Sequence, residues 1–379
     1  MKIVYLVQQT FKSGGVERVL ASKANWLSLH NNDVVIITTE QKGCKSFFDF
    51  NQSIKHIDLG INYWDNTRRS TVKKIPYFFV NQIRHRRRLR KVLSEIKPDV
   101  VVSMFGHDMS HLPHIKDGSV KVLEFHFTHQ RILNMFRPGF LRLWDYWNYR
   151  QMRRTIDKFQ KFVVLSDADR CAWGKEKNTM VIPNPLSFNP RTKASLDSNR
   201  AIAVGRLVEE KGFDRLIEVW KKIQSKYPQW SLEIIGDGPL RDDIQRLINK
   251  NGLQATVTLL PATPQIQEKY IDASLLLMTS RHEGLGMVLI EGQAYGLPCV
   301  SFDVPYGPAS IITNDENGYL IPDGDIDTYA SKVENLIKDV HKRKVMGEKA
   351  RLNSQRYTMD KIMSEWIELF KELTGKGIC

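Results

Sequence analysis

Short apolar segments recur along the whole chain, and each is followed by a turn and then by a stretch with helical periodicity. In the first half of the chain these segments lie at residues 1–7, 34–39, 100–103, 120–125 and 162–165. In the second half they lie at residues 201–205, 231–236, 257–260, 275–278 and 299–302. Strands that alternate with helices form βαβ units around a parallel sheet. The sequence therefore predicts an α/β protein with two Rossmann-like layers.

A polar, proline-containing stretch separates the two series and marks a boundary between domains. We expect an N-terminal domain at residues 1–185, a linker at 186–200, a C-terminal domain at 201–358 and a last helix at 359–379. Two Rossmann-like domains joined by a short linker face each other across a cleft, where we expect a substrate site. The last helix is amphipathic and carries Trp366 and Phe370.

Two glutamates eight positions apart, Glu283 and Glu291, lie in the most informative stretch of the chain, residues 278–308. Glu283 is in a glycine-rich turn directly after an apolar segment, and Glu291 is in the helix that follows. In an open parallel sheet this turn is at the carboxyl edge of the strands, where ligands bind. The free N–H groups at the start of the helix, with the positive end of its dipole behind them, favour an anion there.

A second charged turn, residues 205–212 (GRLVEEKG), follows another apolar segment and opens a helix. It places Arg206 and Lys211 near a helix N-terminus, a combination that suits a diphosphate. Taken alone, these two cations could equally be ordinary surface charges.

Together these motifs resemble glycosyltransferase family 4, the retaining sugar-nucleotide transferases with the GT-B fold. The similarity rests on residues 280–291 (SRHEGLGMVLIE), on the GLP and G-P pairs that follow, and on the agreement of residues 205–212 with the pattern G-R-L-x-x-x-K-G. By this resemblance Arg206 and Lys211 bind the donor's phosphates, Glu283 contacts the transferred sugar and Glu291 binds the ribose hydroxyls. Gly292-Gln293 departs from the family's usual Ala-Met, and a glycine inside a helix predicts tight packing at Gly292.

The resemblance implies further donor contacts in the second half of the chain. The backbone N–H groups of Leu285, Gly286 and Met287 would complete the phosphate and sugar site. Gly236 and Gly238 match the family's G-x-G-P turn beneath the nucleoside. Pro261 stands where the family usually has a glycine that contacts the base, and proline has no N–H to donate there.

The first half of the chain is expected to face the acceptor. Gly14 and Gly15 match the family's glycine pair, where the missing side chains let a sugar or phosphate approach the first helix. His126, at the end of a strand, corresponds to the family's histidine beside the donor sugar. The resemblance also implies that the last helix crosses back onto the N-terminal domain.

Other patterns do not predict a metal site. His107, His111 and His114 have helix-like spacing, but apart from Asp108 no cysteine or carboxylate pattern completes a ligand set. Asp167-Ala168-Asp169 follows Leu165-Ser166 and is better explained as the start of a helix. The four cysteines are far apart in the sequence and predict reduced thiols.

The formal net charge of +14 calls for an anionic partner: nucleic acid, acidic lipid or a phosphorylated substrate. Residues 84–91 contain six Lys or Arg residues, which could also be a solvated helix face. Aromatic and basic residues interleave at residues 136–150, as they do in segments that bind a membrane surface. Because no nucleic-acid-binding motif accompanies these charges, we expect an anionic membrane surface as partner rather than nucleic acid.

The sequence thus predicts a cytoplasmic, metal-independent enzyme without cofactor, peripheral on the inner face of the membrane. By resemblance it moves a hexose (galactose, GalNAc or a related sugar) from a UDP-sugar to a saccharide acceptor. That acceptor is expected to be linked to a polyprenyl diphosphate, in the assembly of a surface polysaccharide such as capsule or O-antigen. A sugar-nucleotide epimerase or hydrolase of the same architecture is the alternative.

Overall fold

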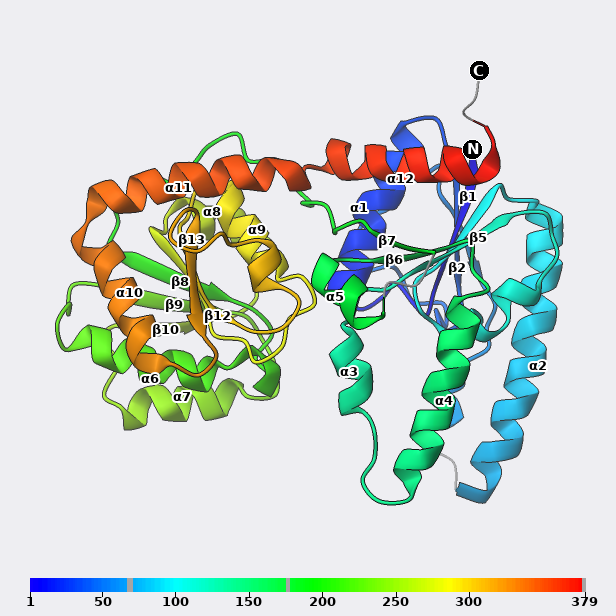
Figure 1. Ribbon diagram of the computed structural model, residues 1–379, viewed down its shortest axis with the longest axis horizontal. Coiled ribbons are helices and arrows are strands. Elements are labelled where there is room, and N and C mark those ends of the chain that lie inside the picture. Colours follow the sequence, from blue (N-terminus) through cyan, green and yellow to red (C-terminus); the bar gives the residue numbers. More distant parts are fainter. Residues whose placement is uncertain (67–70, 175–177, 377–379) are drawn as a thin grey trace. The chain divides into compact units, whose positions relative to one another are not determined.

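The computed structural model describes residues 1–66, 71–174 and 178–376, without the side chains of residues 66 and 71–75. It forms two compact units (Figure 1). The first unit comprises Met1–Ser187 and Met359–Cys379, and the second comprises Phe188–Thr358. Each contains one parallel sheet flanked by helices, so the predicted fold class, with two Rossmann-like domains, is confirmed. Cys44, Cys171 and Cys299 are free thiols, and Cys379 lies outside the described residues.

The sheet of the first unit has the order β3-β2-β1-β4-β5-β6-β7. Its strands are β1 (Lys2–Val7), β2 (Asp33–Thr38), β3 (Lys55–Asp58), β4 (Val100–Ser103), β5 (Val120–Glu124), β6 (Lys161–Val164) and β7 (Thr179–Val181). Alternate residues of β1 pack into different cores: Ile3 and Tyr5 face one side of the sheet, and Val4 and Leu6 face the other. Both faces are therefore buried, as in other parallel sheets covered by helices.

The helices of the first unit include the C-terminal one. They are α1 (Gly15–Leu29), α2 (Thr71–Ile96), α3 (His129–Asn134), α4 (Leu141–Ile156), α5 (Asp167–Ala172) and α12 (Met359–Thr374), with the 3-10 turns η1 (Tyr63–Asn66), η2 (His107–Ser110) and η3 (Leu112–His114). α12 packs beside α1, and its Trp366 and Phe370 are buried in the same core as Ile3. Ser166 accepts a hydrogen bond from the N–H of Asp169, so the predicted helix start at Asp167 is confirmed.

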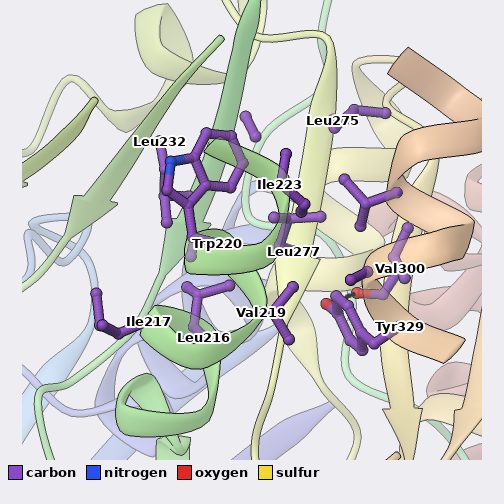
Figure 2. Close-up of a cluster of buried hydrophobic side chains, with 14 of the residues drawn as sticks. Leu216, Ile217, Val219, Trp220, Ile223, Leu232, Leu275, Leu277, Val300 and Tyr329 are labelled. Carbon is purple, nitrogen blue, oxygen red and sulfur yellow. Dashed lines mark hydrogen bonds between the residues drawn. The ribbon is translucent and has the colours of Figure 1, made fainter. Parts of the chain in front are cut away.

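The sheet of the second unit has the order β10-β9-β8-β11-β12-β13. Its strands are β8 (Arg200–Val204), β9 (Ser231–Ile235), β10 (Val257–Leu260), β11 (Leu275–Met278), β12 (Cys299–Asp303) and β13 (Gly318–Pro322). Its helices are α6 (Phe213–Gln224), α7 (Arg241–Lys250), α8 (Ile266–Ile271), α9 (Met287–Ala294), α10 (Ile326–Lys338) and α11 (Val340–Ser354), with the turns η4 (Glu209–Lys211), η5 (Pro308–Ser310) and η6 (Gln355–Tyr357). Figure 2 shows the apolar core that α6 builds around Trp220 against β9 and β11.

Residues 188–199, most of the stretch expected as a linker, belong to the second unit. The N–H of Ala194 donates to Tyr295 O at 2.9 Å. The buried guanidinium of Arg343 donates to Leu196 O from Nε at 3.0 Å and from Nη2 at 2.9 Å, and it also binds the carbonyl groups of Leu336 and Ile337. These contacts fix the stretch against Tyr295 at the end of α9 and against Arg343 of α11, although its polar composition resembles that of a free linker.

Candidate active site

The candidate site lies where the chain reverses its direction across the second sheet. β8 lies between β9 and β11, so the chain builds β9 and β10 on one side of β8 and then crosses to β11 on the other. In open parallel sheets ligands bind at such a switch point, beside the carboxyl ends of the two central strands. The loops after β8 and β11 carry Arg206, Lys211 and Glu283, and the topology therefore brings these three residues to one edge of the sheet.

Lys211 and Glu283 are in direct contact at this edge. Lys211 Nζ lies 2.6 Å from Glu283 Oε1, and the hydroxyl of Ser280 donates to the same oxygen at 2.6 Å. The side chain of Glu283 is 8% exposed and that of Lys211 is 27% exposed, so the pair is partly shielded from water. Arg206 is exposed and has no ion pair with any residue that the structure describes. Ser280 is a site residue that we did not predict, although it lies in the SRHE motif.

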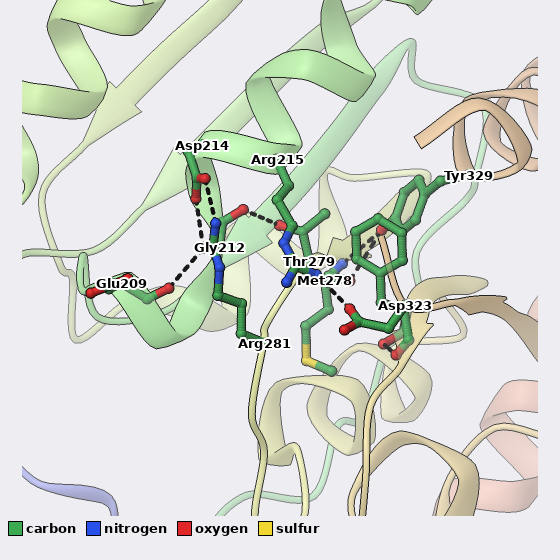
Figure 3. Close-up of polar contacts among 11 residues, drawn as sticks. Glu209, Gly212, Asp214, Arg215, Met278, Thr279, Arg281, Asp323 and Tyr329 are labelled. Atoms are coloured by element: carbon green, nitrogen blue, oxygen red, sulfur yellow. Dashed lines mark hydrogen bonds and ion pairs between the residues drawn. The ribbon is translucent and has the colours of Figure 1, made fainter. Parts of the chain in front are cut away.

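A second set of contacts locks the loop after β8 onto the loop after β11 (Figure 3). Thr279 Oγ1 donates to Gly212 O at 2.8 Å, and Arg281 Nη1 donates to Glu209 O at 2.9 Å. The two Nη atoms of Arg281 also donate to the carboxylate oxygens of Asp214 at 2.8 and 2.5 Å, and these hydrogen bonds hold the pKa of Asp214 below its usual range. The relative position of Lys211 and Glu283 is therefore set by paired loops.

Gly212 is required where these loops meet. Its φ of 62° is left-handed, and a Cβ atom there would lie 2.1 Å from Thr279 O. Gly307, in the G-P pair, also lies close to this loop: a Cβ atom on Gly307 would lie 2.9 Å from Glu283 Cβ. Gly212 and Gly307 thus allow other segments to approach the loop that carries Glu283 closely.

The turn after Glu283 leads into α9. Gly286 precedes the helix in the left-handed conformation, with φ 83°. The N–H groups of Leu285, Gly286 and Met287 donate to no acceptor in the part of the chain that the structure describes. Free N–H groups of this kind at a helix start, beginning two residues after Glu283, are the arrangement that binds an anion.

Glu291 is in α9 and is only 2% exposed. The hydroxyl of Tyr270 donates to its Oε2 at 2.8 Å, and the Tyr270 ring stacks on Tyr295 with 5.5 Å between centroids. Burial and the nearby Glu291 carboxylate raise the pKa of Tyr295 to about 12. Tyr270 is thus a second residue at this site that the motifs did not indicate, because it lies on α8, outside the matched stretch.

Gly292 packs tightly against β11, as predicted. A Cβ atom there would lie 2.6 Å from Leu276 Cδ2. The neighbouring Gln293 is fully buried, and its Oε1 accepts a hydrogen bond from Asn353 Nδ2 at 2.7 Å. Gly292 and Gln293, which stand in place of the family's usual Ala-Met, therefore pack α9 against β11 and α11.

The glycine turn after β9 packs on the loop that carries Arg206. A Cβ atom on Gly236 would lie 1.9 Å from Gly205 O, and one on Gly238 would lie 2.4 Å from Leu207 O. Pro261 follows β10 and is exposed, and the N–H of the next residue, Ala262, donates to Asp237 Oδ2 at 2.9 Å. The structure thus places all three donor-binding candidates of this group on loops at the carboxyl edge of the sheet.

In the first unit, Gly14 is the N-cap of α1 and Gly15 is its first residue. A Cβ atom on Gly15 would meet nothing within 4 Å, so the space beside it is open. Beside Gly14 lies the carboxylate of Glu17, whose Oε1 accepts a hydrogen bond from Gln9 Nε2 at 2.7 Å. An acidic side chain in the first turn stabilises the helix dipole at the point where we expected an acceptor sugar or phosphate.

His126 follows β5 in the first unit, and its side chain is 3% exposed. Its Nε2 lies 3.3 Å from Glu124 Oε1, and Glu124 is paired with Lys23 of α1. Burial lowers the pKa of His126 from its ordinary value. The motifs did not indicate that Glu124 contacts His126 and pairs with Lys23. The first unit therefore carries His126, Gly14 and Gly15, and the second carries the other predicted site residues.

Two family models together match most of the chain. The model described as Glycosyltransferase Family 4 matches residues 13–188, and the model described as Glycosyl transferases group 1 matches residues 188–353. The boundary between the two matches coincides with the boundary between the two structural units.

Individual relatives match over nearly the full length of the chain. An uncharacterized glycosyltransferase of Haemophilus influenzae is 28% identical over 96% of this chain and 98% of its own. A GalNAc-alpha-(1->4)-GalNAc-alpha-(1->3)-diNAcBac-PP-undecaprenol alpha-1,4-N-acetyl-D-galactosaminyltransferase of Campylobacter jejuni is 25% identical over 98% of this chain and 99% of its own. Three other relatives are matched over only 21%, 62% and 45% of their length.

A solved structure has the same fold. A mutant of TarM from S. aureus, in complex with Fondaparinux, alpha-GlcNAc-glycerol and UDP, aligns over 97% of this chain and 99% of its own, with a TM-score of 0.75 and 17% identity.

Proposed function

Because the chain is a GT-B glycosyltransferase, with a family 4 domain at residues 13–188 and a group 1 domain at residues 188–353, we propose that it moves a hexose from a UDP-sugar to a saccharide acceptor with retention at the anomeric carbon. Galactose, GalNAc or a related sugar is the proposed hexose. The Campylobacter jejuni relative is named as a GalNAc transferase, and the TarM mutant was solved with UDP, which supports this choice of donor.

The contact between Lys211 and Glu283 is the observation that carries this proposal. It joins a cation and a carboxylate close in sequence to three N–H groups at the start of α9, which donate to no acceptor among the described residues. Lys211 and Arg206, with these N–H groups, would stabilise the negative charge that develops on the departing diphosphate. Glu283, as an ionised acceptor, would bind hydroxyl groups of the transferred sugar. Glu291 would bind the ribose hydroxyls from its position on α9.

We propose that the acceptor hydroxyl attacks the sugar on the same face from which the diphosphate leaves. This attack retains the configuration at the anomeric carbon. The Oε1 atom of Glu283 is already engaged by Lys211 and Ser280, which suits hydroxyl binding better than a nucleophile. The leaving phosphate would then assist the acceptor hydroxyl. We propose that no resident metal is needed, since Arg206, Lys211 and the helix start supply positive charge. Transfer should therefore persist in excess EDTA.

A lipid-linked acceptor at a membrane surface is the second part of the proposal. Among the helices that the structure describes, none combines the length and apolar character of a membrane span. α4 exposes large apolar side chains at helical spacing, and α2 carries a groove of about 360 Å³ lined by Val80, Ile83, Arg84, Arg87 and Arg88. Apolar side chains beside three arginines suit an anionic lipid or a polyprenyl diphosphate. This would place the enzyme on the inner face of the cytoplasmic membrane, in surface polysaccharide assembly such as capsule or O-antigen.

Ligand-dependent stability followed by product analysis tests the function. A ligand that binds the folded state raises the melting temperature, so UDP and one UDP-hexose should raise it while GDP and ADP should not. With acceptor present, a glycosylated product must form. Free sugar or an epimerised sugar nucleotide, formed equally with and without acceptor, would instead support the hydrolase or epimerase alternative.

A further inference from the structure

Lys23 and Glu124 form an ion pair inside the first unit. Lys23 Nζ lies 2.6 Å from Glu124 Oε1 and 2.7 Å from Oε2, and the two side chains are 0% and 2% exposed. Removing two charges from water costs free energy that their attraction only partly returns. A pair this deeply buried is therefore not explained by stability alone.

Glu124 has a second neighbour, the imidazole of His126. β5 ends at Glu124, and His126 follows two residues later. His126 Nε2 lies 3.3 Å from the same Oε1 atom that binds Lys23. Both ring nitrogens of His126 are buried and lack a well-formed hydrogen bond in the described part of the chain, although Asn184 interacts with the ring.

We propose that Lys23 and Glu124 are positioning residues, which hold the buried imidazole of His126 neutral with the proton on Nε2, the ring nitrogen that faces Glu124. This inference deepens the proposed function and rests on it. A carboxylate next to one ring nitrogen favours the proton on that nitrogen, and thereby fixes what the other nitrogen can do.

Lys23 is needed because Glu124 alone would favour a charged imidazolium. Burial lowers the pKa of His126, Glu124 acts in the opposite direction, and Lys23 offsets Glu124. Tyr5 of β1 is another titratable group near the pair: its ring lies 5.6 Å from Lys23 Nζ, and burial raises its own pKa. With the pair intact, the ring can orient a substrate without adding a positive charge beside it.

The C-terminal helix takes part in this arrangement. The ring of Trp366 on α12 lies 3.7 Å from Lys23 Nζ, and Trp366 is 1% exposed. An aromatic face stabilises a desolvated cation. α12 thus contacts the buried Lys23, which in turn is paired with Glu124.

The test is the protonation state of His126, measured by nitrogen-15 NMR of the full-length protein, together with transfer kinetics. In the wild type, Nε2 should carry the proton. Glu124→Gln should weaken this tautomer preference and lower kcat by on the order of tenfold or more, with the KM for the donor nearly unchanged. Lys23→Met should raise the pH at which His126 becomes protonated. The double variant should return that pH toward the wild-type value, because it removes both charges.

Asp117 and Lys121 provide a matched control. They form another buried ion pair in the first unit, near the opposite end of β5, with side chains 1% and 5% exposed. Asp117→Asn should lower stability without changing the His126 tautomer or kcat.

A proton on Nδ1 in the wild type would overturn the proposal, as would a Glu124→Gln variant with unchanged tautomer and kcat. If the single variants fail to fold, the wild-type spectrum and the double variant decide the question. If the wild type shows the expected tautomer but transfers no sugar to any acceptor, the positioning geometry stands and the proposed function fails.

Discussion

Lys211 Nζ lies 2.6 Å from Glu283 Oε1. The cation proposed to bind the donor's phosphates is therefore in contact with the carboxylate proposed to bind its sugar. Donor binding must exchange this contact for contacts with phosphate and sugar oxygens. The exchange is feasible because Ser280 remains hydrogen-bonded to Glu283 and can keep its carboxylate in place.

Lys211→Ala should therefore lower kcat by about 100-fold or more, the loss typical when one stabilising group at a developing negative charge is removed. The fold should persist, because the Lys211 side chain is partly exposed. Transfer assays and a thermal melt check both points. Wild-type turnover in this variant would refute the role of Lys211. Lys193→Ala removes an exposed ion pair with Glu348 and is the control, with activity expected to be unchanged.

Gly212→Ala should unfold the second unit or abolish activity. A Cβ atom at this position would lie 2.1 Å from Thr279 O, which is backbone and cannot move aside cheaply. Gly252 is the control, because it has a similar φ of 67° but nothing within 4 Å of the added atom. Gly252→Ala should cost only about 1 kcal/mol, the usual penalty for a left-handed residue. Urea denaturation of both variants separates the clash from the backbone strain, and equal losses would show that the clash is relieved.

Gly292→Ala tests the packing of α9 on β11. Overpacking should cost about 1–3 kcal/mol, partly offset by about 1 kcal/mol from the better helix propensity of alanine. The clashing atom is Leu276 Cδ2, so a second substitution, Leu276→Val, should relieve the strain. A double-mutant cycle in urea measures the coupling between the two positions, and additive losses would contradict direct contact.

The stability of the first unit should fall in acid because of two histidines, the buried His85 and the half-buried His111. Burial lowers the pKa of His85 to about 3 and that of His111 to about 4. In the unfolded chain both histidines have a pKa near 6.5. Below this pH the unfolded chain binds protons that the folded chain does not, so the free energy of unfolding decreases as the pH falls below 6.5. Burial raises the pKa of Asp108 to about 6, which acts in the opposite direction between pH 6 and the unfolded value near 4.

His85→Gln should therefore make stability less dependent on pH between 6.5 and 5, measured by urea denaturation at several pH values. The variant also loses the contact between His85 Nδ1 and Tyr63 Oη at 3.1 Å, so its stability at pH 7.5 should be lower. His56→Gln, at an exposed histidine outside this cluster, is the control and should change the slope less. An unchanged slope in His85→Gln would show that His85 does not contribute.

The sequence predicted the central strands but missed β3, β7 and β13. Each of these lies at an edge of its sheet. An edge strand has one unpaired side and less burial, so it can be short and polar or contain glycine and proline. β3 is mostly exposed (KHID), β7 has three residues, and β13 begins with Gly318 and ends with Pro322. Apolar periodicity does not reveal such strands.

The motifs predicted the charged residues of the second unit but not the groups that support them. Arg206, Lys211 and Glu283 lie in short motifs, whose spacing is visible in the sequence. Lys23 and Glu124 are 101 positions apart, and only the folded sheet brings them together. Tyr270 likewise reaches Glu291 from another helix. Long-range pairs of this kind leave no local pattern.

The exposed face of α4 should bind anionic membranes. Phe140, Leu143, Trp144 and Trp147 follow one another at helical spacing, and their exposed fractions are 82%, 77%, 57% and 51%. Exposed apolar side chains beside arginines favour the interface of an anionic bilayer. The protein should co-sediment with vesicles that contain phosphatidylglycerol and much less with vesicles of phosphatidylcholine, and added salt should weaken binding.

The variant Trp144→Ser with Trp147→Ser should lower this binding by about tenfold or more, while transfer to a soluble acceptor analogue is retained. Phe47→Ser is the control, because Phe47 is 60% exposed but lies outside α4. If both vesicle types bind the wild type equally at low salt, or if Phe47→Ser weakens binding as much as the tryptophan variant, α4 is not the membrane-binding face. In that case the groove on α2 could still hold an acceptor diphosphate, but the apolar face of α4 would require another partner.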